Sequence, residues 1–274
     1  MKLAHYLKTL LLCLVLNLVA CATQQPPGEA ESLDTSSVDD RRKPIDLIIN
    51  GDYVVSMDAD ASVYQDSAVA VHEGIILAIG SQAKISATYI ATESLAGDGR
   101  IVMPGLINGH SHAAMTLLRG VADDLALMDW LNNYIFPAEL EFVDSEFVRI
   151  GTELACWEMI RGGTTTFVDM YYYPDVIADV VDSCGMRALV SATVIDQLSP
   201  DAQNAEDSIA KGLAFIDRWK GKNSRIMPIF GPHANYTLNA DQLRATREAA
   251  NEAGVPISIH LSESPFELQY SKQA

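Results

Sequence analysis

The sequence contains few cysteines and few basic residues for its length. Four cysteines occur in 274 residues, and two of them, Cys13 and Cys21, lie close to the N-terminus. Small disulfide-stabilised folds carry more cysteines in a shorter chain, so this class is excluded. Lysine and arginine number 19 against 36 aspartates and glutamates, which gives a formal net charge of −17. Because such a chain repels phosphate backbones, we expect no nucleic-acid partner.

Glycine and proline are not enriched either, with 17 and 11 residues, while hydrophobic residues make up 49% of the chain. This composition excludes global disorder and suffices for one or two folded domains. Cys156 and Cys184 lie in helix-like segments, where we expect ordinary half-buried thiols. A single bridge between these two cysteines stays open as an alternative in an oxidising compartment.

An apolar run near the N-terminus is too short to cross a bilayer. As a helix, the run from Thr9 to Ala20 would span about 18 Å, whereas a hydrocarbon core is about 30 Å thick. A weakly basic start precedes the run and Leu18-Val19-Ala20-Cys21 ends it, which is the pattern of a bacterial lipoprotein signal. We therefore predict a signal peptide over residues 1–20 and lipidation of Cys21. The alternative is a plain signal peptide followed by a chance cysteine.

Residues 21–43 are rich in proline, serine, glutamate, glutamine and aspartate and have no apolar period. Such a segment is typical of a flexible tether. A lipid anchor followed by a tether predicts a globular domain held at the bacterial cell envelope, on the periplasmic side or at the cell surface, without crossing the membrane.

Short β-type segments without a long helix fill residues 44–103. Asn50-Gly51 separates two apolar stretches, and Glu73-Gly74 separates two more, so we predict two hairpins. Together these segments predict a small β domain of the sandwich type. His72 lies beside the second turn, and we expect it on the surface.

From residue 104 to residue 274 the pattern changes to strands that alternate with helices. Strands are expected at residues 105–108, 164–170, 187–195, 225–230 and 255–260. Helices are expected at residues 146–161, 175–184, 205–220 and 240–253. This alternation predicts an α/β fold with parallel strands and crossover helices.

Two histidines, His110 and His112, directly follow the first strand of this region. Residues i and i+2 of an extended segment point to the same side, so both imidazoles can meet one cation at about 2.0–2.1 Å. Imidazole suits zinc, iron and nickel better than calcium or magnesium. Surface hairpins also contain such pairs, but the position at a strand end after a glycine-rich approach favours a metal site.

Residues 104–139 read PGLINGHSHAAMTLLRGVADDLALMDWLNNYIFPAE, a segment that resembles the first-strand signature of the amidohydrolase superfamily. More narrowly, it resembles the branch of methylthioadenosine/S-adenosylhomocysteine deaminases and chlorohydrolases. The similarity covers nearly everything after residue 45 and continues, in family order, through GGTTTFVDMY, GMRALV, FGPHANYTL and IHLSES. The resemblance implies a metal-dependent hydrolase with a (β/α)8 TIM-barrel fold, of which about five βα units are present here.

The resemblance also implies roles for individual residues. Three histidines would bind one divalent metal ion, zinc or alternatively iron: His110, His112 and His260. Glu263 would be a catalytic carboxylate that moves a proton between water and a leaving amine. His233 would contact the substrate and polarise the attacked centre, and Glu139 would accept hydrogen bonds from ribose hydroxyls.

Other residues have weaker assignments. For Leu127, Met128 and Trp130 we favour core packing, with the wall of an apolar pocket as the alternative. Asp169 ends the second parallel strand, where we expect it to brace the barrel mouth without a catalytic role.

The sequence departs from the family pattern in four places. A histidine after the sixth strand and an aspartate after the eighth have no counterpart in these 274 residues, so a fragment, a second polypeptide that supplies the rest and a decayed relative all stay open. Asn235 stands where the family often has proline. Ala192 stands where members that hold the homocysteine carboxylate carry arginine. The missing guanidinium favours methylthioadenosine, adenosine or another neutral amino-heterocycle as substrate.

We therefore expect a hydrolytic deaminase that cleaves a non-peptide C–N bond of a purine-nucleoside-like small molecule, with little turnover by these 274 residues alone. A chlorohydrolase or a guanine or cytosine deaminase of the same superfamily is the alternative within the class. A non-catalytic envelope lipoprotein is the alternative from another class. Membrane contact is expected through the lipid anchor only, and a homo-oligomer stays open.

Overall fold

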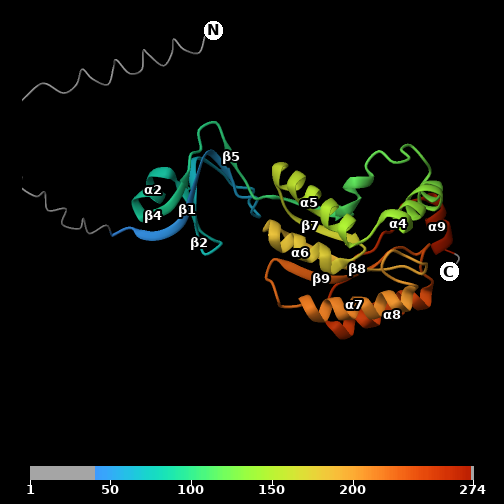
Figure 1. Ribbon diagram of the computed structural model, residues 1–274. Coiled ribbons are helices and arrows are strands. Elements are labelled where there is room, and N and C mark those ends of the chain that lie inside the picture. Colours follow the sequence, from blue (N-terminus) through green and yellow to red (C-terminus); the bar gives the residue numbers. More distant parts are fainter. Residues whose placement is uncertain (1–40, 273–274) are drawn as a thin grey trace, which may run out of the picture. The chain divides into compact units, whose positions relative to one another are not determined.

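The computed structural model describes residues 41–272 of the chain (Figure 1). The predicted signal peptide, the lipidation site Cys21 and the tether up to residue 40 lie outside the described residues. Within the described part, none of the helices is both long enough and apolar enough to cross a bilayer. The described residues divide into two compact units, one built from residues 41–54 and 64–100, the other from residues 55–63 and 101–272.

The first unit contains a mixed sheet. Its strands are β1 (Lys43–Val55), β2 (Val63–His72), β3 (Ile75–Ser81) and β4 (Tyr89–Leu95), in the order β3-β2-β1-β4. The β2–β3 pair is antiparallel, and β1 pairs with β4 in parallel. A short helix, α2 (Gln82–Thr88), connects β3 to β4 and buries Ile85 against Ile45, Ile48, Ala68 and Ala70. The described residues of this unit thus form one sheet with a helix, and the second layer of the predicted sandwich is not among them.

The predicted turn at Asn50-Gly51 is wrong, because β1 runs through both residues. Asn50 Nδ2 donates to the carbonyl oxygen of Leu95 at 2.9 Å and to Ser94 Oγ at 3.2 Å, so the asparagine is satisfied inside the sheet. A long-range partner has overridden the local turn preference. The turn at Glu73-Gly74 is confirmed, since both residues have positive φ, 50° and 74°, between β2 and β3.

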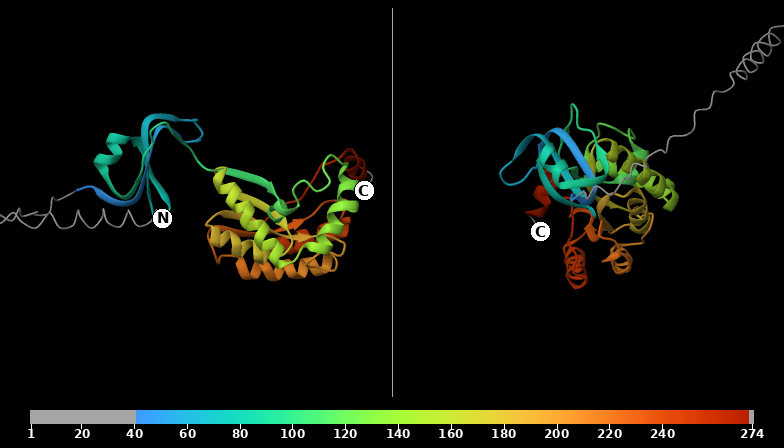
Figure 2. Two further views of the ribbon diagram at one scale, coloured as in Figure 1. Left: turned by 45° about the horizontal axis from the view of Figure 1, so that its top comes forward. Right: turned by 90° about the vertical axis from the view of Figure 1, so that its left-hand side faces the viewer.

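The two-residue strand β5 (Ile101–Val102) pairs with β1, and the second unit contains a separate parallel sheet. Its strands are β6 (Leu106–Ser111), β7 (Thr164–Tyr171), β8 (Arg187–Val194) and β9 (Ile226–Pro232), in the order β6-β7-β8-β9. Four helices lie along one face of this sheet (Figure 2): α5 (Ser145–Arg161), α6 (Pro174–Cys184), α7 (Ala205–Trp219) and α8 (Ala240–Ala253). The predicted alternation of strands and helices is confirmed.

Local signals explain why these helices begin and end where they do. Asp144, Asn204 and Asn239 accept backbone hydrogen bonds at the N-termini of α5, α7 and α8. Gly185 and Gly254 end α6 and α8 in the left-handed conformation, which glycine adopts without steric cost. Between the helices and the sheet, Phe167, Phe215 and Phe230 are completely buried.

The predicted strand at residues 255–260 is only partly formed. It makes two isolated parallel bridges, Phe230 with Ile257 and Ala234 with His260. Pro256 has no N–H group and so cannot complete a regular ladder. Even so, its carbonyl accepts a hydrogen bond from Phe230 N at 3.2 Å, and the segment runs beside β9. This pairing brings His260 to the same end of the sheet as the end of β9.

The connection after β6 consists of short helical pieces: η1 (Ala113–Leu118), α3 (Leu127–Trp130), η2 (Leu131–Ile135) and α4 (Phe136–Phe142). A last helix, α9 (Pro265–Ser271), follows the 255–260 segment. Cys156 is buried in α5, Cys184 is partly buried at the end of α6, and both thiols are free.

Candidate active site

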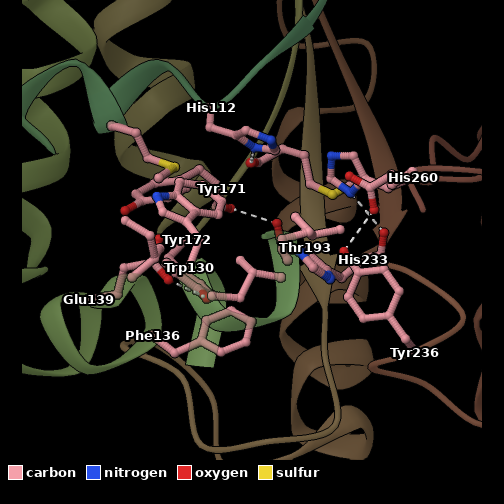
Figure 3. Close-up of a pocket in the computed structure, with 16 residues that line it drawn as sticks. His112, Trp130, Phe136, Glu139, Tyr171, Tyr172, Thr193, His233, Tyr236 and His260 are labelled. Carbon is pink, nitrogen blue, oxygen red and sulfur yellow. Dashed lines mark hydrogen bonds between the residues drawn. The ribbon is translucent and has the colours of Figure 1, made fainter. Parts of the chain in front are cut away.

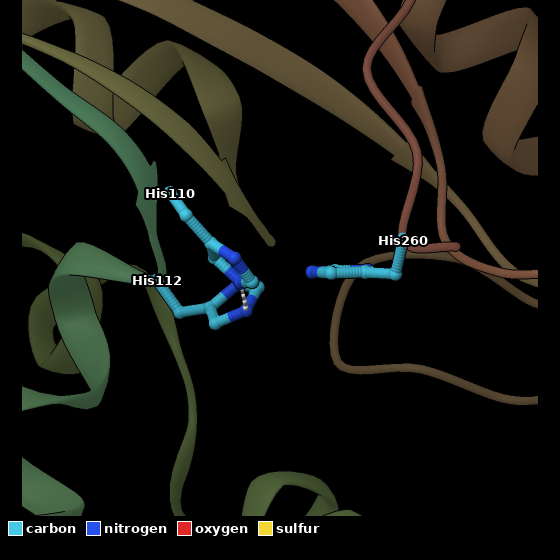
Figure 4. Close-up of side chains that lie close together, drawn as sticks. All are labelled: His110, His112 and His260. Carbon is cyan, nitrogen blue, oxygen red and sulfur yellow. Dashed lines mark hydrogen bonds between the residues drawn. The ribbon is translucent and has the colours of Figure 1, made fainter. Parts of the chain in front are cut away.

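Three histidines from opposite edges of the parallel sheet converge. His110 and His112 come from the end of β6, and His260 comes from the segment beside β9. Their ligand nitrogens all lie within 4.8 Å of one another, and the ring centroids are 5.0–5.2 Å apart. Figure 4 shows the His260 ring reaching toward the other two from the opposite side. The structure therefore brings together the three residues that the sequence suggested as metal ligands.

The donor geometry fits a tetrahedral metal ion. His110 Nε2 and His112 Nε2 are 3.3 Å apart. Two imidazole nitrogens on one tetrahedral zinc, each at about 2.0–2.1 Å, are separated by about 3.3 Å. His112 Nδ1 donates to the Met170 carbonyl at 2.6 Å, and His260 Nδ1 donates to the His233 carbonyl at 2.8 Å. Since a carbonyl only accepts, these bonds place the proton on Nδ1 and leave the Nε2 lone pairs for a cation.

His112 is held in the form that binds metals. Burial, with smaller contributions from the neighbouring His260 and His110, lowers the pKa of His112 to about 4, against the opposing hydrogen bond to Met170. The ring is therefore neutral at physiological pH. A neutral imidazole keeps its lone pair, which is the requirement for a ligand.

Asp169 holds the backbone on both sides of His112. Its carboxylate is fully buried at the end of β7 and accepts hydrogen bonds from Ser111 Oγ at 3.0 Å and from Ala113 N at 2.6 Å. Burial raises the pKa of Asp169 to about 7, although these two hydrogen bonds oppose the shift. Both donors flank His112 in the chain, so Asp169 fixes the backbone that carries the predicted ligands. This position agrees with the bracing role expected from the sequence.

Beside the histidines lies a pocket with an apolar wall and a polar wall (Figure 3). The apolar side includes Leu127, Trp130 and Phe136, and the polar side includes His233 and Glu263. Leu127 and Trp130 thus line the pocket, where we had favoured core packing. Met128 lines a neighbouring cavity that shares Phe136 with this one. Leu127, Met128 and Trp130 are only partly buried, as expected for side chains that line a cavity.

His233 directly follows β9 and faces the histidine cluster. Its ring centroid is 5.1 Å from that of His260, and its Nδ1 is 3.0 Å from Thr237 Oγ1. Burial lowers the pKa of His233 to about 3, and the neighbouring His260 and His112 act in the same direction. A neutral imidazole at this position can donate or accept a hydrogen bond without adding charge to the site.

Glu139 is a buried acid in the same pocket. Only 4% of the residue is exposed, and Tyr172 Oη donates to its Oε2 at 3.1 Å. Burial raises the pKa of Glu139 to about 7, although the nearby hydroxyl groups of Tyr171 and Tyr172 oppose the shift. A carboxyl group in this setting can accept hydrogen bonds from hydroxyl groups of a bound molecule.

Glu263 lies three residues after His260 and reaches the pocket from an exposed loop. Its Oε2 accepts a hydrogen bond from Tyr236 Oη at 2.7 Å. Tyr236, Tyr171, Tyr172 and Thr193 also line the pocket, although no sequence pattern predicted a role for them. They lie near strand ends, close in sequence to Asp169, Ala192 and His233. This position is the feature of the sequence that could have identified them as pocket residues.

Known proteins of similar sequence include two named deaminases. The chain is 42% identical over 223 residues to the 5-methylthioadenosine/S-adenosylhomocysteine deaminase of Syntrophobacter fumaroxidans, covering 81% of this chain and 50% of that protein. It is 40% identical over 229 residues to the 5'-deoxyadenosine deaminase of Methanosarcina mazei, covering 83% of this chain and 51% of that protein. The chain thus spans about half the length of the curated relatives it matches.

A solved structure gives the same result for the fold. An adenosine deaminase from Xanthomonas campestris with bound zinc matches with a TM-score of 0.81 and 38% identity, over 85% of this chain and 53% of that chain. The model of the amidohydrolase family matches residues 101–274, which is more than half of the chain. This chain therefore belongs to the amidohydrolase family.

Proposed function

We propose that this chain carries the metal- and substrate-binding part of a zinc-dependent deaminase that hydrolyses an exocyclic amine of a purine-nucleoside-like molecule. The observation that carries the proposal is the convergence of His110, His112 and His260 beside a pocket that also holds Glu139 and Glu263. The names of the relatives and of the zinc-bound neighbour support the same reaction class.

In this proposal the three imidazoles would hold a zinc ion, which would supply Lewis acidity toward water. Glu263 takes a proton from the attacking water and delivers it to the ring nitrogen next to the amine-bearing carbon. A second proton transfer through Glu263 lets the amine leave as ammonia, while the carbon keeps the oxygen. His233 hydrogen-bonds the group that forms at the attacked carbon. Glu139 accepts hydrogen bonds from the ribose hydroxyls and so sets the distance between the base and Glu263.

The pocket favours a neutral nucleoside over one with an anionic extension. Among the described residues, its lining contains neither lysine nor arginine. Ala192, at the position where an arginine would pair with a homocysteine carboxylate, is 2% exposed at the end of β8. A carboxylate would find no guanidinium there. We therefore favour adenosine, 5'-methylthioadenosine or 5'-deoxyadenosine over S-adenosylhomocysteine.

The test measures zinc uptake and then ammonia release. We expect His110→Ala and His112→Ala to abolish zinc uptake by the full chain, while His72→Ala, which changes a half-exposed histidine of the other unit, leaves it unchanged. Zinc-loaded protein should release ammonia slowly from the three neutral nucleosides, since we expect low turnover by these 274 residues, and should release none from inosine, which lacks the amine. Unaltered uptake in both histidine variants would remove the metal assignment. Zinc uptake without nucleoside binding would favour a non-catalytic envelope protein instead.

We also propose that the protein is exported and anchored through a lipid on Cys21. The support is the sequence Leu18-Val19-Ala20-Cys21 at the end of a short apolar run. Mass spectrometry of the membrane fraction should find an acylated N-terminal cysteine. The Cys21→Ala variant should lack the acyl group and leave the membrane fraction. Recovery of an uncleaved chain from the cytoplasm would contradict this proposal.

A further inference from the structure

The loop after His260 is held in an unusual backbone conformation. Ser262 has a φ of 63°, in the left-handed region that L-residues other than asparagine and aspartate rarely adopt. A residue stays in such a conformation only where surrounding contacts hold it there. The next residue is Glu263, so the conformation of Ser262 sets the direction in which Glu263 leaves the backbone.

The contact that holds this loop is a buried carboxylate. Glu267 is 2% exposed and uses both of its oxygens on consecutive backbone amides. Ser262 N donates to Oε1 at 2.7 Å, and Glu263 N donates to Oε2 at 2.6 Å. Glu267 N in turn donates to Ser264 Oγ at 3.2 Å, which closes the loop onto the start of α9. These short, charge-assisted bonds make the loop a fixed platform.

A second contact holds the side chain of Glu263. Tyr236 Oη donates to Glu263 Oε2 at 2.7 Å. The Tyr236 ring itself packs edge-on against His233, with ring centroids 5.9 Å apart and an interplanar angle of 88°. His233 is tied to the cluster through its carbonyl, which accepts from His260 Nδ1. Tyr236 thus connects the carboxylate of Glu263 to the body of the site.

We propose that Glu267 and Tyr236 are positioning residues for Glu263: Glu267 fixes the backbone from which Glu263 projects, and Tyr236 fixes one oxygen of its carboxylate. With Oε2 held, proton exchange with the substrate falls to Oε1. This proposal rests on the proposed function, in which Glu263 carries protons. A proton carrier must lie within about 2.6–3.2 Å of its partner, and misplacement by about 1 Å can lower a rate about 100-fold.

The first part of the test asks whether Glu267 holds the loop. Amide hydrogen exchange of Ser262 and Glu263 is compared in the zinc-loaded full chain and its Glu267→Gln variant. Glutamine keeps the size but replaces one acceptor oxygen with an NH2 group, so we expect at least one of the two amides to exchange about tenfold faster or more. Gln269→Ala, an exposed substitution in the same helix, is the control and should leave both rates unchanged. Unchanged exchange in Glu267→Gln would overturn the role of Glu267.

The second part asks whether the two residues act through Glu263. With the nucleoside that gives the most ammonia, Glu267→Gln and Tyr236→Phe should each lower kcat about 10- to 100-fold and change KM by less than about threefold. In a Glu263→Gln background, each substitution should lower kcat further by less than about twofold. Tyr134→Phe, at an exposed tyrosine, is the matched control. Equal losses in both backgrounds would mean a merely structural effect and overturn the proposal.

Failure of the proposed function gives a different pattern of results. If the zinc-loaded wild-type chain releases no ammonia, the deaminase proposal fails, and the positioning proposal is then decided by nuclear magnetic resonance. The side-chain methylene resonances of Glu263 should show one rotamer in the wild type and averaging in Tyr236→Phe, while the Tyr134→Phe spectrum should match the wild type. Averaging already present in the wild type would overturn the role of Tyr236.

Discussion

Glu139 shows how a single residue couples the pocket to pH. Burial raises its pKa from 4.5 to about 7, so the folded protein binds a proton more tightly than the unfolded chain does. Between about pH 4.5 and 7 the folded state therefore holds the extra proton, and stability falls as the pH rises through this window. Above it, the buried anion costs about 3 kcal/mol relative to an unperturbed carboxylate.

We therefore expect Glu139→Gln to be more stable than the wild type at pH 8, by up to about 3 kcal/mol, and close to it at pH 4.5. Glutamine cannot ionise and still accepts the hydrogen bond from Tyr172. Urea unfolding at both pH values measures the difference. Glu248→Gln, at an exposed position of α8, is the control and should show no such pH dependence. A constant difference at the two pH values would show that Glu139 does not titrate in this window.

At the residue scale, the candidate site residues could be predicted from the sequence, but the residues that position them could not. His110 and His112 could be named from their spacing at a strand end, because two imidazoles there can share one cation. The resemblance to the amidohydrolase family suggested His233, His260 and Glu263. The roles of Tyr236 and Glu267 depend on hydrogen bonds that join separate turns of the chain. Tyrosines and glutamates at such positions are common without a role, so the sequence alone offered no reason to select them.

At the level of elements, close packing between α5 and η1 controls the position of the predicted ligands. A Cβ on Gly151 would lie 2.3 Å from the carbonyl oxygen of Ala114, which stands two residues after His112. A glycine is thus required where α5 crosses the segment that follows β6. Any side chain there must push η1 away, and His112 with it.

Gly151→Ala should therefore destabilise the protein by about 1–3 kcal/mol and weaken zinc binding in the same variant. Gly162→Ala, at the C-terminal end of the same helix, is the matched control, because its Cβ would meet the nearest atom at 3.4 Å and its φ is −83°. Urea denaturation and zinc titration measure the two effects. A Gly151→Ala variant with normal stability and zinc affinity would show that η1 shifts without cost.

The elements themselves divide into predictable and unpredictable ones for physical reasons. Helices α5 to α8 carry their own apolar period and end signals, so their positions could be predicted to within a few residues. The Asn50-Gly51 turn failed because β4 supplies hydrogen bonds that a local rule cannot include. Helix α2 is only one to two turns long and was missed, since seven residues show no clear period.

For the whole molecule, the predicted metal site joins β6, the first strand of the parallel sheet, to the segment at residues 255–260 beside β9. Zinc that binds only the folded protein should raise its stability, by about 2.7 kcal/mol at 100 times the dissociation constant. For the second unit this corresponds to a rise of about 5–10 °C in Tm. Thermal unfolding with zinc and with a chelator measures it. The His110→Ala variant should show no shift, and an equal shift in that variant would place the zinc elsewhere.

The approach of His110 to His260 also sets the shape of the sheet. Strands lie about 4.8 Å apart, so the first and fifth strands of a flat sheet would be about 19 Å from each other. Two histidine side chains could not bridge that span and still meet with ring centroids 5.0 Å apart. The sheet must therefore be curved as in a barrel, and the affinity for the cation depends on this curvature. A substitution such as Gly231→Ala, whose Cβ would press on Ser191 at 2.7 Å between β8 and β9, would be read out in metal affinity without touching any ligand.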